Sequence, residues 1–171
     1  KSTPEALNII RERSSHNKMV AVGEIGLDYH YNHSPRETQL HVFEEQLKIA
    51  IETNLPVVIH SREADADMME MLNKYGPLLP KKGVIHSFTS SLDLAKVALS
   101  NGFYIGFNGI ITFKSAQNVR DVLEIVPMDR ILIETDAPFL TPTPHRGKEN
   151  APFYLPHILS KVCELKGVDE A

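Results

Sequence analysis

The sequence has very little cysteine and no long apolar run, and each absence narrows what the protein can be. Cys163 is the only cysteine among 171 residues, so no disulfide can form within the chain. A single thiol is typical of proteins from a reducing compartment. No apolar run approaches the roughly 20 residues of a membrane-spanning helix, and no signal peptide is visible. We therefore expect a cytoplasmic protein with no membrane partner.

An excess of charge of one sign is also missing. The formal net charge is −4, which creates no general field that would attract nucleic acid, so any phosphate binding must be local or depend on a metal ion. Hydrophobic residues make up 42% and charged residues 23% of the chain, as in ordinary globular proteins long enough to bury a core. Without a repeat or a break in composition, we expect one domain over residues 1–171.

Two common catalytic motifs are absent. Gly23 and Gly26 are expected to let the backbone turn tightly around Glu24, but they are not followed by the Gly-Lys-Ser/Thr of a phosphate-binding loop. Neither Ser61 nor Ser87 lies in a Gly-x-Ser-x-Gly elbow, and each directly follows a histidine. A Ser-His-Asp triad is therefore a weak alternative.

Short apolar runs alternate with segments of helical periodicity along the chain. This alternation is typical of βαβ units with a parallel sheet, and strands that are apolar throughout indicate that both faces of the sheet are covered. Ser34, either Ser90 or Ser91, and Ser115 are candidate N-caps for three of the helices. The expected strands cover residues 19–22, 57–59, 84–85, 103–107 and 131–133, and the main helices cover about 34–53, 63–75, 91–101, 115–126 and 152–166.

Four polar residues stand at, or just beyond, the expected carboxyl ends of strands: Glu24, His60, His86 and Asp136. Parallel strands direct these ends to one face, so the four can converge. Two imidazoles and two carboxylates suit a divalent metal centre, and one carboxylate can bridge two ions about 3.5–4 Å apart. Either histidine could instead be a hydrogen-bonded residue at the sheet end, and Asp136 could cap a turn. The repeated arrangement favours the metal.

Basic residues near these positions suggest how a phosphate could be held. Arg62 follows His60 by two residues, and Arg146 lies in the loop after Asp136. A guanidinium matches phosphate geometry, so both are candidate contacts, whereas Lys148 is equally well explained as a solvated loop residue. Asp28 could be a turn residue or an outer partner of the metal site.

Five segments resemble the TatD family of metal-dependent deoxyribonucleases, which are amidohydrolase-like TIM barrels. They run from Met19 to Asn150 in the order of the family, and together they are highly specific. The matching segments are AVGEIGLDYH, LPVVIHSREA, GVIHSFTSS, FYIGFNGIITF and ILIETDAPFLTPTPHRGKEN.

The resemblance implies a role for each candidate residue. Glu24 would bridge two metal ions, His60 and His86 would complete one site, and Asp136 would belong to the other and interact with the attacking water. It also implies hydrolysis of DNA phosphodiesters, commonly from a 3′ or single-stranded end. The expected ion is Mg²⁺, with Zn²⁺ or Mn²⁺ possible, and Glu24 and Asp136 are the expected catalytic residues.

One part of the family pattern is missing. The family's Asp-x-His-x-His signature does not occur before Met19. Compared with an eight-stranded barrel of about 250 residues, the chain is expected to supply only the fourth to eighth βα units. The alternatives are therefore an amidohydrolase or other esterase with the same metal site, and a truncated barrel without catalysis.

Overall fold

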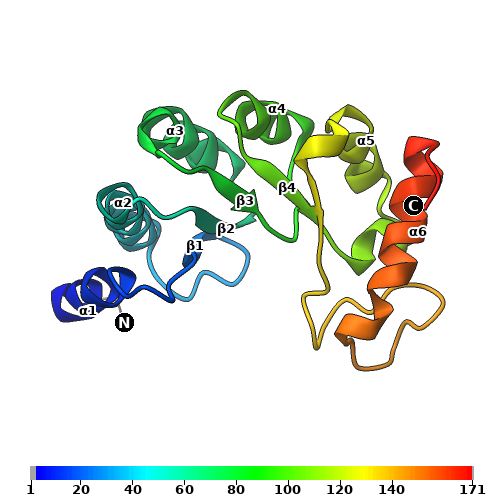
Figure 1. Cartoon of the computed structure of the whole chain (residues 1–171), viewed down its shortest axis with the longest axis horizontal. Coiled ribbons are helices and arrows are strands. Elements are labelled where there is room, and N and C mark those ends of the chain that lie inside the picture. Colours follow the sequence, from blue (N-terminus) through cyan, green and yellow to red (C-terminus); the bar gives the residue numbers. More distant parts are fainter. Residues whose placement is uncertain (1–2, 171) are drawn as a thin grey trace.

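The computed structural model describes residues 3–170, which form a five-stranded parallel sheet with helices along its outer side (Figure 1). Each strand pairs in parallel with its neighbour in the sequence, in the order β1-β2-β3-β4-β5. The alternating α/β architecture predicted from the sequence is thus confirmed. The strands are β1 (Val22–Asp28), β2 (Val57–Arg62), β3 (Gly83–Ile85), β4 (Tyr104–Phe107) and β5 (Ile131–Ile133).

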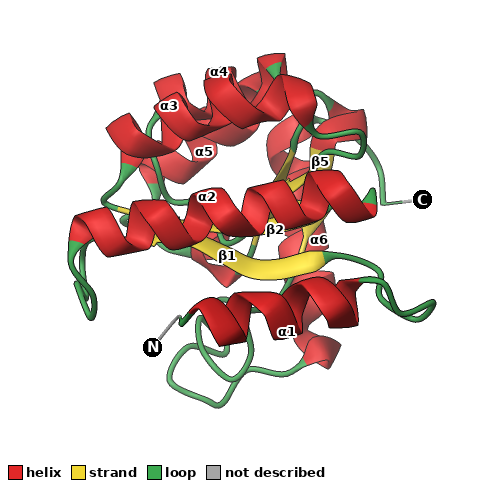
Figure 2. Cartoon of the chain, turned by 90° about the vertical axis from the view of Figure 1, so that its left-hand side faces the viewer, coloured by secondary structure: helices red, strands yellow, loops and turns green. Residues whose placement is uncertain are grey.

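Helices occupy every connection between the strands, and α2 lies along β1 when the sheet is seen from the left-hand side of Figure 1 (Figure 2). No described helix is long and apolar enough to cross a bilayer. The α-helices are α1 (Pro4–Ser14), α2 (Arg36–Thr53), α3 (Asp65–Tyr75), α4 (Leu92–Ser100), α5 (Gln117–Ile125) and α6 (Leu155–Lys166). Short 3₁₀ segments cover Gly76–Leu78, Gly109–Thr112, Met128–Arg130 and Pro152–Tyr154.

The core lies between the helices and one face of the sheet. Phe43 and Leu47 of α2 are fully buried, as is Ile59 of β2. Along β2 burial alternates, and Val58 and His60 on the other face are only partly buried. The prediction that both faces are covered was therefore wrong for the described residues, because their helices lie over one face. The face of the sheet that is not covered by helices can therefore present polar side chains such as His60.

The first strand begins and ends later than the sequence predicted. It was expected over residues 19–22, whereas β1 contains Gly23 and Gly26, so Glu24 lies within the strand and not beyond it. A Cβ on Gly23 would lie 2.7 Å from the Cβ of Val58, and one on Gly26 would run into the backbone of His60. These glycines thus allow close pairing with β2 and do not form a turn.

Of the three predicted caps, only one forms. The Ser91 hydroxyl accepts a hydrogen bond of 3.3 Å from the Leu94 N–H. Pro35 occupies the N-cap position of α2, and Ala116 occupies that of α5, both without a side-chain cap, so the predictions for Ser34 and Ser115 were wrong. The first turn of α2 is supported by Gln39, whose amide donates to the Ser34 carbonyl at 2.9 Å.

Candidate metal centre

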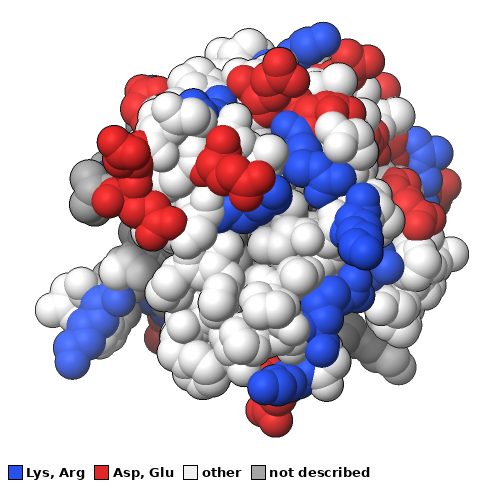
Figure 3. Space-filling view, turned by 90° about the vertical axis from the view of Figure 1, so that its right-hand side faces the viewer, with Lys and Arg blue, Asp and Glu red and all other residues white. Residues whose placement is uncertain are grey.

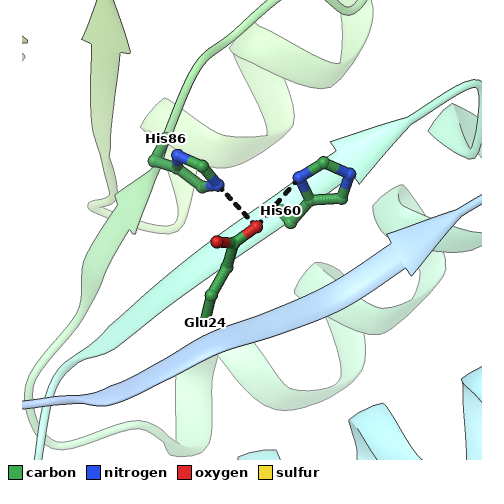
Figure 4. Close-up of side chains that lie close together, drawn as sticks. All are labelled: Glu24, His60 and His86. Carbon is green, nitrogen blue, oxygen red and sulfur yellow. Dashed lines mark ion pairs between the residues drawn. The ribbon is translucent and has the colours of Figure 1, made fainter. Parts of the chain in front are cut away.

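Three of the four predicted ligands come together on neighbouring strands. Glu24 lies in β1, His60 in β2 and His86 directly after β3, and one ligand atom from each falls within 4.8 Å of the others (Figure 4). Oε1 of Glu24 is 3.0 Å from Nδ1 of His60 and 2.9 Å from Nε2 of His86. Since β2 pairs with both β1 and β3, the sheet itself holds the three side chains side by side.

The buried nitrogen of His86 shows that this cluster fits a cation. The His86 side chain is only 10% exposed, and its Nε2 has no hydrogen-bond partner among the described residues despite the nearby Glu24 oxygen. The ring nitrogen is thus close to the carboxylate but not directed at it as a donor, as expected when both atoms face a common point. Imidazole and carboxylate are ligands that Zn²⁺ and related divalent ions accept.

Asp28 has both roles that the sequence left open. Its Oδ1 accepts the Tyr31 N–H at 2.9 Å in the turn after β1, and its Oδ2 lies 3.0 Å from Nε2 of His60. Burial raises the pKa of Asp28, but the Tyr31 N–H and His60 outweigh burial and hold this pKa below its usual value. A charged Asp28 therefore orients the imidazole whose other nitrogen faces Glu24.

Glu134 contacts His86, although only Asp136 of the same segment was predicted to take part in the site. It directly follows β5, accepts the backbone N–H of Ser87, and lies 3.6 Å from Nδ1 of His86. Burial lowers the pKa of His86, but Glu134 and Glu24 together raise it to about 9. The signal was present in the sequence as a second acid at the end of the same strand.

Asp136 lines the same cleft but is not one of the three clustered ligands. It lies three residues beyond β5, which β4 separates from β3. Burial raises the pKa of Asp136, and Glu134 and Glu24 add to this effect while the two histidines oppose it. The charges of the cluster therefore influence the pKa of Asp136. Its role as a metal ligand stays a prediction.

The cleft has a volume of about 660 Å³ and includes one of the two predicted phosphate contacts. Arg62 lines it, with Cζ 4.9 Å from the centre of the Tyr31 ring. Arg146 is not among the lining residues, and its Cζ stands 3.7 Å over the ring of Phe113. The lining residues are Glu24, Tyr31, His60, Ser61, Arg62, His86, Ser87, Thr89, Ile110, Asp136, Phe139 and Leu140.

A parallel sheet that gathers a Glu-His-His cluster from adjacent strands defines an α/β protein with a candidate metal centre. The particular family follows from comparison of the whole chain. The chain belongs to the family described as TatD related DNase, whose sequence profile matches residues 1–171. The resemblance inferred from the five segments is confirmed.

Individual relatives show the same relationship. YabD of Bacillus subtilis, named an uncharacterized metal-dependent hydrolase, is 44% identical over 164 residues, which are 96% of this chain and 64% of that protein. The Erwinia tasmaniensis protein named 3′-5′ ssDNA/RNA exonuclease TatD is 38% identical over 170 residues, 96% of this chain and 65% of that protein. The chain therefore spans just under two thirds of their length.

A solved structure supports the fold. The crystal structure of YjjV, a TatD homologue from Escherichia coli K12, matches with a TM-score of 0.86 and 34% identity, covering 96% of this chain and 64% of that one. Together with the five parallel strands, this match supports an architecture of the TIM-barrel type. The placement of these strands as the fourth to eighth of a closed barrel stays a prediction.

Proposed function

We propose that this chain carries the metal-binding cleft of a phosphodiesterase that shortens single-stranded DNA from its 3′ end. The observation that carries the proposal is the convergence of His60 Nδ1 and His86 Nε2 on one oxygen of Glu24, within a cleft that also contains Asp136 and Arg62. Mg²⁺ is the expected ion, with Zn²⁺ or Mn²⁺ as alternatives.

Each residue has a defined part in this proposal. Glu24, His60 and His86 would hold the divalent cation, which when bound supplies polarisation of a phosphate oxygen and a lowered pKa for water. Asp136 lines the same cleft as the three ligands and would take the proton from the attacking water. Arg62 orients the phosphate through its paired N–H donors.

The substrate class is supported by a relative and by the distribution of charge. The Erwinia tasmaniensis relative is named a 3′-5′ ssDNA/RNA exonuclease. On the face shown in Figure 3, a band of Lys and Arg lies next to Asp and Glu side chains, and much of the remaining surface is uncharged. The net charge of −4 gives no general attraction for nucleic acid, so binding depends on contacts within the cleft.

A direct assay tests the proposal. A 5′-labelled single-stranded DNA is incubated with the chain and Mg²⁺, with and without EDTA, and the products are resolved by length. We expect a ladder that shortens from the 3′ end, is lost with EDTA and is lost in Glu24→Gln. The exposed His41 lies outside the cleft, so His41→Ala provides a matched control.

The same preparation separates the alternatives. Turnover of an amide or lactone panel without cleavage of DNA would identify an amidohydrolase or other esterase. Tight binding of a single ion, measured by calorimetry, with no turnover of any substrate would identify a truncated barrel without catalysis. Either result would replace the proposed activity.

A further inference from the structure

The cleft has an apolar part as well as a polar one. Beside the acids and imidazoles, it is lined by Phe139, Leu140 and Ile110. Phosphate chemistry requires only the polar side chains, so this apolar shelf needs a separate explanation. Sites that combine a few directed polar groups with apolar walls are typical of small organic ligands.

The backbone beneath Phe139 is tightly held. Asn150 is only 3% exposed, and its amide group donates to the carbonyls of Thr135 at 2.7 Å and Phe139 at 2.6 Å. The Asn150 N–H donates to the Pro138 carbonyl at 2.9 Å, and the Phe139 N–H donates to the Asp136 carbonyl at 3.0 Å. These four hydrogen bonds fix the position of Phe139 relative to Asp136.

The ring on this backbone is nevertheless open to solvent. Phe139 is 69% exposed, and no aromatic ring or cation stacks on it among the described residues. Tyr31, the other exposed aromatic residue of the cleft, already has the Arg62 guanidinium 4.9 Å from its ring centre and His33 stacked at 5.6 Å. Phe139 is therefore the ring that is available to a planar ligand.

We propose that Phe139 is a stacking platform for the terminal nucleobase of a single-stranded nucleic acid whose phosphodiester lies at Glu24, His60 and His86. The inference rests on the proposed function and adds the group that is recognised. A base inside a duplex is stacked on its neighbours and cannot lie on this ring, so the platform favours single-stranded ends. Aromatic stacking tolerates any base, because every base has a π-face.

Binding of modified oligonucleotides to the full chain tests the platform. Two 5′-fluorescent single strands are compared by anisotropy with Mg²⁺, each with a non-hydrolysable phosphonate as its last linkage. One ends in a nucleotide with a base and the other in an abasic nucleotide. We expect Phe139→Ala to weaken binding of the first by about 5- to 150-fold and to leave the second unchanged. Phe139→Trp should restore binding of the first.

The control is Phe153→Ala. Phe153 is similarly exposed, at 70%, and does not line the cleft, so its removal should change neither affinity. Equal weakening of both strands by Phe139→Ala, or no weakening, would overturn the platform. If the wild type still shortens DNA in that case, the proposed function survives. If the wild-type protein binds neither oligonucleotide, both the proposed function and the stacking platform are refuted.

Discussion

Asp28 holds one nitrogen of His60 while Glu24 faces the other. Oδ2 of Asp28 is 3.0 Å from Nε2 of His60, and Oε1 of Glu24 is 3.0 Å from Nδ1 of the same ring. A hydrogen bond from the Nε2–H of His60 to Asp28 favours the tautomer with its lone pair on Nδ1, where a metal ion would need it. A residue outside the three-ligand cluster thus sets the tautomer of one ligand.

We expect Asp28→Asn to weaken metal binding by about 10- to 100-fold without unfolding the protein. The amide of asparagine can donate to Nε2, which favours the tautomer with the proton on Nδ1. Titration calorimetry with Mn²⁺ measures the affinity, and ¹⁵N shifts of the His60 ring report the tautomer. Asp169→Asn removes an exposed acid outside the cleft and should change neither quantity. An unaltered affinity in Asp28→Asn would show that this contact does not position His60.

His86→Ala should remove metal binding at the Glu24 cluster while leaving the fold largely intact. The imidazole is a predicted ligand, and its side chain faces the cleft and is not part of the apolar core. Calorimetry gives the metal affinity and circular dichroism the fold. The exposed His41, replaced in the same way, serves as a matched control. Metal affinity that persists in His86→Ala would refute the assignment of the cluster.

Much of the site could be predicted because the apolar runs of the strands are visible in the sequence, although β1 and β2 continue past Glu24 and His60. Apolar runs followed by a histidine located His60 and His86, and parallel pairing brings such residues together without further information. Glu134 could not be separated from Asp136 in the same way. Its role depends on the Ser87 N–H, which follows β3, and on the space beside Gly106 in β4.

In the fold, too, features set by the local sequence were predicted, whereas features set by contacts with distant residues were not. The strand at Ile131–Ile133 was predicted within its observed bounds, since its apolar run is local. The error in β1 arose because Gly23 and Gly26 resemble turn residues, whereas their reason lies in close contact with Val58 and His60 of another strand. The predicted N-caps Ser34 and Ser115 were wrong in a similar way, because Pro35 and Ala116 occupy the N-cap positions of α2 and α5.

Gly106→Ala should impair the metal site through Glu134. A Cβ at this position would collide with Oε1 of Glu134 and lie 3.1 Å from Cα of His86. We expect weaker metal binding and a loss of about 1–3 kcal/mol in the free energy of unfolding from overpacking. Denaturant unfolding and calorimetry measure the two effects.

Glu134→Gln provides the comparison for Gly106→Ala. It keeps the volume of the side chain and an acceptor for the Ser87 N–H but removes the charge near His86. Metal affinity should fall with little loss of stability. If Gly106→Ala binds the ion as tightly as wild type, Glu134 does not support His86.

The last prediction concerns stability in acid. Asp67 has a side chain only 7% exposed, and it accepts hydrogen bonds from the Tyr29 hydroxyl and the Arg36 guanidinium. The hydrogen bond from Arg36 is the main reason that the pKa of Asp67 is lowered, and Tyr29 adds to it against the effect of burial. Because the pKa of Asp67 is lower in the folded protein than in the unfolded chain, its charged form stabilises the fold at pH values above the unfolded-state pKa. This contribution is lost as the pH falls through the folded-state pKa.

We therefore expect Asp67→Asn to lower the free energy of unfolding at neutral pH by about 1–3 kcal/mol and to flatten its decline below pH 4. The Arg36 side chain is 64% exposed, so solvent screening keeps the effect at the lower end of that range. Urea unfolding between about pH 3 and 7 measures both changes, with the 80% exposed Asp93 replaced by Asn as the control. If the free energy of unfolding of Asp67→Asn and of wild type falls with pH in parallel across the acid range, the pKa of Asp67 is the same in the folded and unfolded states. The prediction would then be wrong.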